Sequence, residues 1–487
     1  MSHNQNHGFH FDNSYLRLPS CFYECVTPAA ASHHEIVIFN TTLAETLGLD
    51  FSDTNPAEQA AVLSGQTQLP GGGYFAQAYA GHQFGHFTTL GDGRAIMLGE
   101  HLTPEQQRVD IQFKGAGRTP YSRQGDGKAA LGPMLREYII SEGMHALGIP
   151  TTRSLAVVST GDTVLRETPL AGALLTRVAC SHLRVGIFEF AARQEGKDTL
   201  QALVDYTVQR HYPEFVNHEL PALALLQTVI TKQVALVVDW MRVGFIHGVM
   251  NTDNMTLSGE TIDYGPCAFM DTYDPNTVFS AIDQNGRYAY QNQPPIAQWN
   301  LARFAETLLP LLSENETEAI NIAQDCLSDF ADQYQQQWLT MMRHKLGLLN
   351  EQPEDAELIT DLLTWMHKAH ADFTLTFREL SQPHQPEGEH YQTEAFQTWY
   401  ARWQTRHEYN NASHEDVIAL MQRTNPAVIP RNHLVEQALD AAYDHDFTPL
   451  HELLAALKTP YDNRHRAEKY KRPPLPEERV YQTFCGT

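Results

Sequence analysis

Lys114 is the first candidate for chemistry, because it ends a short run with the alternation of a β-strand. Ile111 and Phe113 fall on one face of that run, and Lys114 falls on the other, polar face. A lysine that faces a cleft can place a point charge on a nucleotide phosphate when a carboxylate holds it. Glu137, in the helix predicted to follow, is the best-placed carboxylate. The alternative is a solvated surface lysine near a solvated helix glutamate.

A glycine-rich turn, LGDGR, precedes this lysine and contains Gly91, Gly93 and Arg94. Its glycines permit a tight turn whose backbone amides can approach phosphates without obstruction by side chains. A plain hairpin turn has the same composition, so the turn alone does not separate the two interpretations. The polar, glycine-flanked loop 118–128 follows Lys114, and we expect it to cover a ligand.

Two arginines stand out in a chain with an excess of acidic residues. Arg177 and Arg184 lie seven residues apart, and guanidinium groups suit the geometry of phosphate oxygens. They can therefore clamp phosphates. Pairing at the surface with Glu167 or Glu189 is the competing interpretation.

A histidine, an asparagine and an aspartate form the most specific pattern. His247, Asn254 and Asp263 follow the protein-kinase template H-R-D-x-x-x-x-N and D-F-G, whose Asn and second Asp hold the metal ions on the phosphates. In this alignment the catalytic aspartate of the template falls on Val249. Asp253 is a nearby carboxylate that can accept a hydroxyl proton with altered geometry. A polar loop capped by Asx turns is the alternative.

Two histidines have the spacing of a helical zinc pair but not its context. His82 and His86 are four residues apart, yet Gly81 and Gly85 disfavour a helix, and Gln83 replaces the glutamate of the HExxH motif. We therefore predict no zinc site here.

Charge and hydropathy exclude several classes of partner. The 487 residues carry a formal net charge of -24, which repels nucleic acid phosphates and anionic membranes. We expect neither nucleic acid nor membrane as a partner, and an anionic ligand needs a locally basic site. The apolar segment 221–240 contains Lys232 and Asp239, which favours a buried helix over a membrane span.

The cysteines and the N-terminus indicate the compartment. Six cysteines, at positions 21, 25, 180, 267, 326 and 485, form no CxxC pair, which argues against a disulfide framework and a zinc ribbon. The N-terminal segment has no basic stretch followed by an apolar one, so no secretory signal is predicted. We expect a reducing, cytoplasmic location.

The elements that must position these residues change in type near residue 195. Strand-like runs are predicted before it, at 84–90, 95–98, 109–113, 155–158, 164–167 and 174–178, with one helix at 134–147. Amphipathic helices are predicted beyond it, at 222–242, 301–312, 316–346 and 356–379.

This order of elements predicts an α+β fold with two lobes and a cleft between them. Four parts are expected: an N-terminal extension over 1–75, irregular apart from a short helix near 41–49, a β-rich small lobe over 76–195, a mainly helical large lobe with the catalytic loop over 196–457, and a C-terminal tail over 458–487.

Taken together, these motifs resemble the selenoprotein O family, which includes the bacterial YdiU-type proteins, over nearly the whole chain. Seven stretches carry the resemblance: YAGHQFG at 79–85, LGDGR at 90–94, FKGAGRTPYSR at 113–123, HALGIPTT at 145–152, HGVMNTDN at 247–254, IDYGP at 262–266 and NQPPIAQWN at 292–300. The resemblance implies a protein-kinase-like pseudokinase fold that binds ATP in an orientation reversed relative to kinases. AMP would pass to Ser, Thr or Tyr hydroxyls of proteins, and pyrophosphate would leave.

The resemblance also assigns roles to residues of this chain. Asp253 would accept the proton, and Asn254 and Asp263 would bind Mg²⁺, with Mn²⁺ as a substitute. The residues implied in ATP binding are Gly91, Gly93, Arg94, Lys114, Asp126, Gly127, Arg177, Arg184 and Asp263. Glu137 would form the structural ion pair with Lys114.

The chain departs from some relatives at its C-terminus, where it has Cys485 in place of selenocysteine. We hypothesise that Cys485 pairs with Cys267 as a redox gate, which requires Cα atoms within about 7 Å. Two free thiols are the alternative.

Two rival functions use the same residues. A protein kinase would transfer the γ-phosphoryl group, and a catalytically dead scaffold would bind ATP and partners without forming a product.

Overall fold

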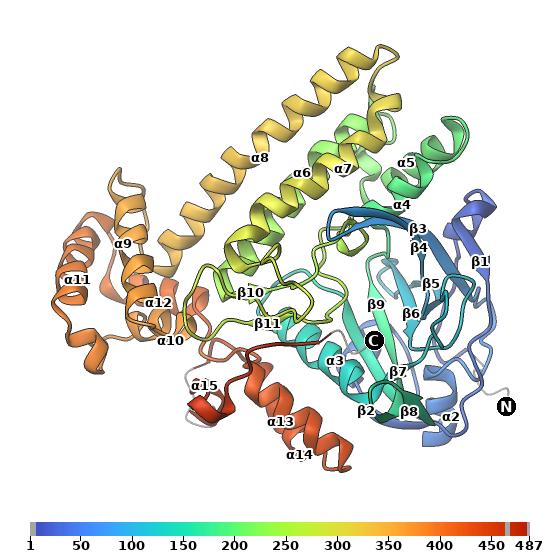
Figure 1. The fold of residues 1–487 in the computed structure, drawn as a ribbon, viewed down its shortest axis with the longest axis horizontal. Coiled ribbons are helices and arrows are strands. Elements are labelled where there is room, and N and C mark those ends of the chain that lie inside the picture. Colours follow the sequence, from blue (N-terminus) through green and yellow to red (C-terminus); the bar gives the residue numbers. More distant parts are fainter. Residues whose placement is uncertain (1–5, 463–467, 485–487) are drawn as a thin grey trace.

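The computed structural model describes residues 6–462 and 468–484. One antiparallel sheet dominates its N-terminal part, and helices dominate the rest (Figure 1). The strands follow the order β1-β3-β5-β6-β9-β8-β2, with β4 paired to β3 and β7 paired to β9. Their bounds are β1 Tyr23–Cys25, β2 Glu35–Phe39, β3 Phe75–Gln83, β4 His86–Gly91, β5 Ala95–Leu102, β6 Arg108–Lys114, β7 Ala129–Ala130, β8 Arg153–Leu165 and β9 Pro169–Ala179.

The alternation in β6 decides what each face of the sheet packs against. Ile111 and Phe113 are fully buried in a cluster with residues of the N-terminal helices α1 (Thr41–Thr46) and α2 (Pro56–Leu63). The other face packs against α3 (Leu131–Ala146), which begins beside Pro133 as predicted. The strand therefore points Lys114 toward α3 and the helical part of the chain.

The helical part is built around α6 (Pro221–Val243), which packs against the long helices α7 (Gln293–Leu312) and α8 (Glu316–Lys345) (Figure 1). A short hairpin of β10 (Phe245–Ile246) and β11 (Ala268–Phe269) frames the loops that carry the kinase-like motif. The other helices are α4 Val185–Ala191, α5 Asp198–His211, α9 Asp355–Lys368, α10 Phe373–Leu380, α11 Glu394–His407, α12 His414–Thr424, α13 Asn432–Tyr443, α14 Thr448–Leu457 and α15 Glu468–Lys471.

Helix α6 is the one described helix that is long and apolar enough to cross a membrane by length and composition. Most of its apolar window is buried by neighbouring parts of the chain, which is the environment of a core helix. The prediction of a buried helix over 221–240 agrees with this packing.

The α+β class is confirmed, while three predictions of individual elements are wrong. The segment expected to be mostly irregular before residue 75 contributes β1 and β2 to the sheet, because β1 pairs with β3 and β2 pairs with β8. The strand predicted at 155–158 and the first half of the one predicted at 164–167 are parts of β8, which ends at Leu165 and whose register shifts at an irregularity between Ser159 and Thr163.

The single helix predicted over 356–379 is the third wrong prediction, because it is two helices, α9 and α10. His370 lies between them with a φ of 51°, a left-handed conformation that ends a right-handed helix. The bounds predicted for the four parts of the chain remain a prediction.

Candidate active site

Lys114, at the end of β6, is held by two carboxylates. Its Nζ lies 2.6 Å from Glu137 Oε2 on α3 and also contacts the carboxylate of Asp263. The Lys114 side chain is only 5% exposed and that of Glu137 is fully buried, so the solvated-surface alternative is excluded. The carboxylate of Glu137 thus holds the lysine beside the loop that carries Asp263.

Arg177 joins this cluster from β9, where it pairs in register with Gln112 of β6. Its Nε lies 3.2 Å from Glu137 Oε1, and its Nη2 lies 4.0 Å from Asp263 Oδ1. Despite these two contacts, Nε of Arg177 has no hydrogen-bond partner among residues 6–462 and 468–484. The arginine therefore adds a second positive charge to the same crevice.

The surroundings of Asp263 keep it ionised. Burial alone would raise its pKa, but the charges of Lys114, Arg177 and Arg94 outweigh burial and hold the pKa far below its usual range. The backbone at Asp263 has a φ of 65°, a left-handed conformation that is uncommon for a residue with a side chain. Such conformations occur where the surrounding structure fixes a functional side chain.

His247 ties the two halves of the motif together. Its Nε2 donates to the carbonyl of Ile262 at 2.9 Å, and the amide of Val249 donates to its Nδ1 at 3.3 Å. Burial lowers the pKa of His247, which fits the neutral ring that this pair of bonds requires. The histidine thus fixes the position of Asp263 relative to the loop 249–254.

Asp253 is a buried carboxylate with almost no partners. It is 7% exposed, and its Oδ1 has no hydrogen-bond partner in the described part of the chain. Burial raises the pKa of Asp253 to about 6, against the opposing charge of Arg184. A carboxylate with this pKa is largely ionised near pH 7 and can still accept a proton.

Two glycines make the room for Asp253. A Cβ on Gly81 of β3 would lie 2.5 Å from Asp253 Oδ1, and a Cβ on Gly186 of α4 would lie 3.2 Å from its Cα. In the sequence, Gly81 argued against a helical zinc pair and formed part of a family motif, but neither it nor Gly186 was predicted to make room for Asp253. A glycine in the interior of a strand was the available signal, because it often marks a close approach.

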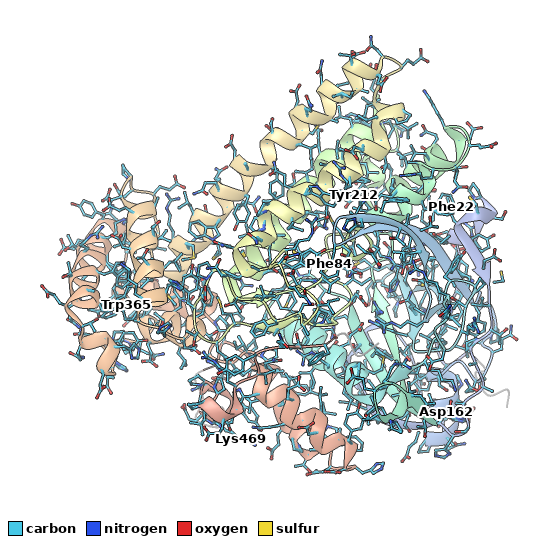
Figure 2. The ribbon with its side chains drawn as sticks, viewed as in Figure 1. Phe22, Phe84, Asp162, Tyr212, Trp365 and Lys469 are labelled. Atoms are coloured by element: carbon cyan, nitrogen blue, oxygen red, sulfur yellow. The ribbon has the colours of Figure 1, made fainter. Side chains whose placement is uncertain are left out.

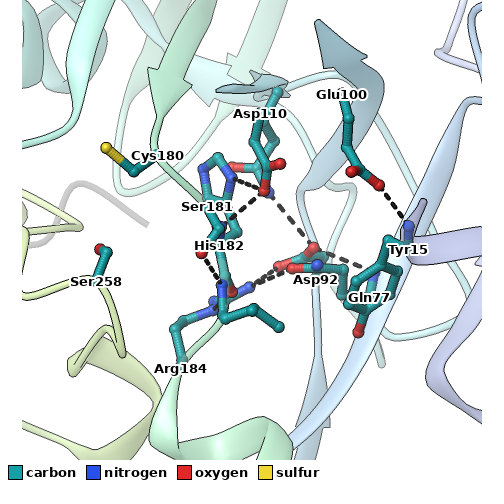
Figure 3. A network of polar contacts seen from close by, with 12 residues as sticks. Tyr15, Gln77, Asp92, Glu100, Asp110, Cys180, Ser181, His182, Arg184 and Ser258 are labelled. Atoms are coloured by element: carbon teal, nitrogen blue, oxygen red, sulfur yellow. Dashed lines mark hydrogen bonds and ion pairs between the residues drawn. The ribbon is translucent and has the colours of Figure 1, made fainter. Parts of the chain in front are cut away.

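Arg184 lies in a second polar network, shown in Figure 3. Its Nη2 donates to Asp92 Oδ1 at 2.8 Å and to Gln77 Oε1 at 3.2 Å, and its guanidinium lies 4.2 Å from the centroid of the Tyr79 ring. The surface-pairing alternative is wrong for Arg184, because it is buried and pairs with Asp92 inside the glycine turn. Arg184 thus links that turn to the surroundings of Asp253.

The glycine turn itself is covered by the loop 118–128. The ring of Tyr121 packs directly on Gly91, where a Cβ would lie 2.2 Å from Cγ of the ring, and the Ser122 hydroxyl donates to the carbonyl of Gly93. These glycines are therefore required for the packing of the loop. The expected contact of the turn with phosphates remains a prediction.

Asp126 and Gly127 lie on the outer part of the same loop. The Asp126 carboxylate lies 3.1 Å from Arg166, and Gly127 accepts a hydrogen bond from the Gly117 amide at 3.0 Å. Across the described residues, no hydrogen bond or ion pair joins Asp126 or Gly127 to Lys114. Their predicted role in nucleotide binding stays a prediction.

The residues predicted to hold a metal offer oxygen donors that suit Mg²⁺. Asn254 Nδ2 donates to the carbonyl of Val249 at 3.1 Å, which leaves Oδ1 as the amide atom available to a cation. Asp263 adds a carboxylate. Within residues 6–462 and 468–484, no group of three or more His, Cys, Asp or Glu side chains could hold a metal ion. A divalent ion here would therefore take further oxygens from a bound nucleotide.

The two histidines with zinc-like spacing lie on adjacent strands. His82 is on β3 and His86 on β4, in a hairpin whose register pairs Gln83 with His86. His82 Nδ1 contacts the carboxylate of Glu189, which also accepts a hydrogen bond from Thr252. These contacts tie the hairpin to the residue before Asp253, a connection that the sequence did not indicate.

Cys267 is buried next to the loop that carries Asp263, and burial raises the pKa of its thiol to about 12. Cys485 lies outside the described residues. The tail reaches this region at Thr483, whose hydroxyl donates to the carbonyl of Pro266. The pairing of Cys267 with Cys485 stays a prediction.

Comparison with known proteins identifies relatives over the full length. A family model described as "Protein adenylyltransferase SelO" matches residues 6–458. A protein of Nitrosococcus oceani named "Protein nucleotidyltransferase YdiU" is 60% identical over 485 residues, which cover 99% of this chain and 98% of the relative. A protein of Alcanivorax borkumensis with the same name is 58% identical over 481 residues, covering 99% of both chains.

Proposed function

This chain belongs to the SelO family of protein adenylyltransferases, and we propose that it transfers AMP from ATP to Ser, Thr or Tyr hydroxyls of proteins. Its kinase-like α+β fold and its enzyme class, protein nucleotidyltransferase, follow from membership of the family. The finer features, namely the site residues, the metal and the acceptor group, are the content of the proposal.

The observation that carries the proposal is the replacement of the usual catalytic aspartate by a buried carboxylate four residues later. Val249 cannot accept a proton, whereas Asp253 is buried, unpaired at Oδ1 and has a pKa of about 6. This position suits a base that acts on a hydroxyl approaching from a different direction than in a kinase. A changed direction of attack is consistent with attack on a different phosphorus atom.

The proposed reaction is a single displacement at the α-phosphorus of ATP. The acceptor hydroxyl oxygen forms a bond to the α-phosphorus while its proton passes to the carboxylate of Asp253. The bond from the α-phosphorus to the bridging oxygen breaks, and pyrophosphate leaves with that electron pair. Lys114 and Arg177 hold the phosphate oxygens and stabilise the charge that develops on the leaving group. Mg²⁺, when bound by Asn254 and Asp263, would neutralise further phosphate charge.

The position of the radiolabel on ATP tests this proposal against its closest rival. The full chain is incubated with Mg²⁺, a protein acceptor and ATP labelled at either the α- or the γ-phosphorus. Transfer of AMP predicts protein label from α-labelled ATP alone. Label from γ-labelled ATP would indicate a kinase, and metal-dependent ATP binding without either label would indicate a catalytically inactive scaffold.

A reducing, cytoplasmic setting fits the free thiols of the described residues, which are Cys21, Cys25, Cys180, Cys267 and Cys326. We further propose that Cys267 and Cys485 form a redox gate, supported by the contact of Thr483 with Pro266. A Cys485→Ser protein should lose any response of its activity to reductant. An unchanged response would remove the gate and leave the transferase proposal intact.

A further inference from the structure

A groove of about 610 Å³ opens beside the tip of the β3–β4 hairpin. Its walls are the hairpin tip and the segment 282–296, which follows the motif loops and leads into α7. We call it the acceptor groove. It is lined by Phe84, Ile282, Gln284, Arg287, Pro295 and Ile296 among others. Figure 2 shows Phe84 where the sheet meets the loops of the helical part.

Direct hydrogen bonds connect this groove to the loop that carries Asp253. The amide of Phe84 donates to Asn251 Oδ1 at 3.0 Å, and the Tyr288 hydroxyl donates to the same oxygen at 2.7 Å. The amide of His82 donates to Thr252 Oγ1 at 2.7 Å. Asn251 and Thr252 immediately precede Asp253 in the chain. A polypeptide bound in the groove would therefore lie close to the proposed proton acceptor.

Arg287 places a guanidinium in the groove. No carboxylate lies within ion-pairing distance of its guanidinium in the described parts of the chain, and its Nε is buried without a hydrogen-bond partner. The guanidinium packs beside Gly85 and lies 4.9 Å from the centroid of the Trp299 ring, so it is held in place rather than mobile in solvent.

The acidic residue of the groove, Asp283, forms no ion pair with the guanidinium of Arg287. Both oxygens of Asp283 are turned into their own loop, where they accept from the amides of Arg287 and Tyr288 at 2.9 and 2.8 Å. A buried carboxylate with such bonds is already satisfied. The guanidinium of Arg287 therefore stays available to pair with an acidic ligand, in a chain whose formal net charge is -24.

The rest of the groove is apolar enough to hold a polypeptide. Ile282 is 61% exposed, and Phe84 is half-buried against the Tyr288 ring, with centroids 5.1 Å apart. An exposed isoleucine beside an aromatic ring offers apolar surface to a bound side chain.

We infer that the acceptor groove binds the segment of the target protein that carries the reacting hydroxyl, and that Arg287 pairs with an acidic side chain of that segment. This inference rests on the proposed function, because only a protein substrate needs such a place beside Asp253. It assigns a preference for hydroxyls flanked by Asp or Glu. The excess of negative charge on the whole chain would produce the opposite preference.

Binding of two matched peptides tests the inference without requiring turnover. Both carry one serine in the middle and a fluorescent label at one end, and the serine is flanked by glutamates in one peptide and by glutamines in the other. Fluorescence anisotropy measures their affinity for the full chain with Mg²⁺ and an ATP analogue whose α–β bridge is a methylene group. We expect about tenfold tighter binding of the glutamate peptide, as for a charge-assisted hydrogen bond.

Variants of Arg287 show whether the groove causes that preference. Arg287→Gln should abolish the difference between the two peptides, and Arg287→Glu should make the glutamate peptide the weaker one. Arg402→Gln is the matched control, because Arg402 is an exposed arginine on α11 that pairs with Asp361 and Glu357. This variant should keep the preference and the activity of the unmodified chain.

The possible results separate the inference from the proposed function. Equal binding of the two peptides, or a preference that survives Arg287→Gln in a protein with normal thermal unfolding, overturns the inference. Transfer of the α-label to the same peptides is scored separately. Its absence counts against AMP transfer, while the binding result still decides the role of the groove.

Discussion

Two carboxylates of the same loop region, Asp263 and Asp253, have pKa values that are shifted in opposite directions. Asp263 faces Lys114, Arg177 and the charge of Arg94, and its pKa is held far below the usual range. Asp253 is also buried, yet its Oδ1 is unpaired and its pKa is raised to about 6. Neighbouring cations therefore keep the Asp263 carboxylate charged, while burial leaves Asp253 with a pKa at which a carboxylate can exchange a proton, the contrast on which the proposed roles rest.

The largest effect on AMP transfer is expected from removing the carboxylate of Asp263. Asp263→Ala should lower AMP transfer by several orders of magnitude, about 10³-fold or more, because Lys114 loses a partner and the proposed metal loses a ligand. Transfer is measured with α-labelled ATP. Asp361→Ala is the matched control, since Asp361 on α9 pairs with the exposed Arg402 of α11. Near-normal transfer by Asp263→Ala would refute the metal assignment.

Removing the carboxylate of Asp253 should have the next largest effect on turnover. Asp253→Asn keeps the shape of the side chain but cannot accept a proton, so turnover should fall by about 10²- to 10⁴-fold. Binding of ATP, measured by calorimetry, should persist, because the groups predicted to hold the phosphates are intact. A variant that turns over at the normal rate would show that Asp253 is not the base.

A smaller effect is expected from moving Asp253 without changing its chemistry. The Cβ introduced by Gly81→Ala would meet Asp253 Oδ1 at 2.5 Å and displace the carboxylate. Misplacement of a reacting group by about 1 Å can cost about 10²-fold in rate, so a tenfold to hundredfold loss of turnover is expected. Gly72→Ala, on a loop before β3, is the control. Full activity of Gly81→Ala would mean that Asp253 can shift without consequence.

The smallest effect concerns stability. The pKa of Asp253 is higher in the folded chain than in the unfolded one, so the folded state binds more protons and loses stability as the pH rises from about 4 to about 6. Asp253→Asn removes this loss, which amounts to up to about 3 kcal/mol in the free energy of unfolding. The variant should therefore unfold at a higher temperature than the unmodified chain at pH 8, and show no such gain at pH 4. The opposite pattern would mean that Asp253 stabilises the fold.

The sequence predicts the two carboxylates unequally well, for a physical reason. The ion pair of Lys114 with Glu137 follows from alternation along a strand and from a helix that comes next in the chain, and both are local features. The motif of His247, Asn254 and Asp263 is also local. The surroundings of Asp253 are not, because Gly81 and Gly186 come from β3 and α4, far away in the sequence. Only the folded chain brings them together.

The same limit applies to the N-terminal segment and to Arg184. Strands β1 and β2 are short and lie at the edges of the sheet, so their patterns are weak until their partners are known. Arg184 was expected at phosphates or at the surface, and its pairing with Asp92 depends on the turn between β4 and β5. Periodicity along the chain carries no information about such long-range pairs.

The dependence of kcat/KM for ATP on pH tests the central contrast most directly, when measured for the unmodified chain and for Asp253→Asn. We predict that AMP transfer by the unmodified chain rises as the pH increases through about 6, as Asp253 loses its proton, and that Asp253→Asn lacks this rise at a greatly reduced rate. The same rise in the variant, or a flat profile for the unmodified chain between pH 5 and 8, would contradict the assignment of Asp253 as the proton acceptor.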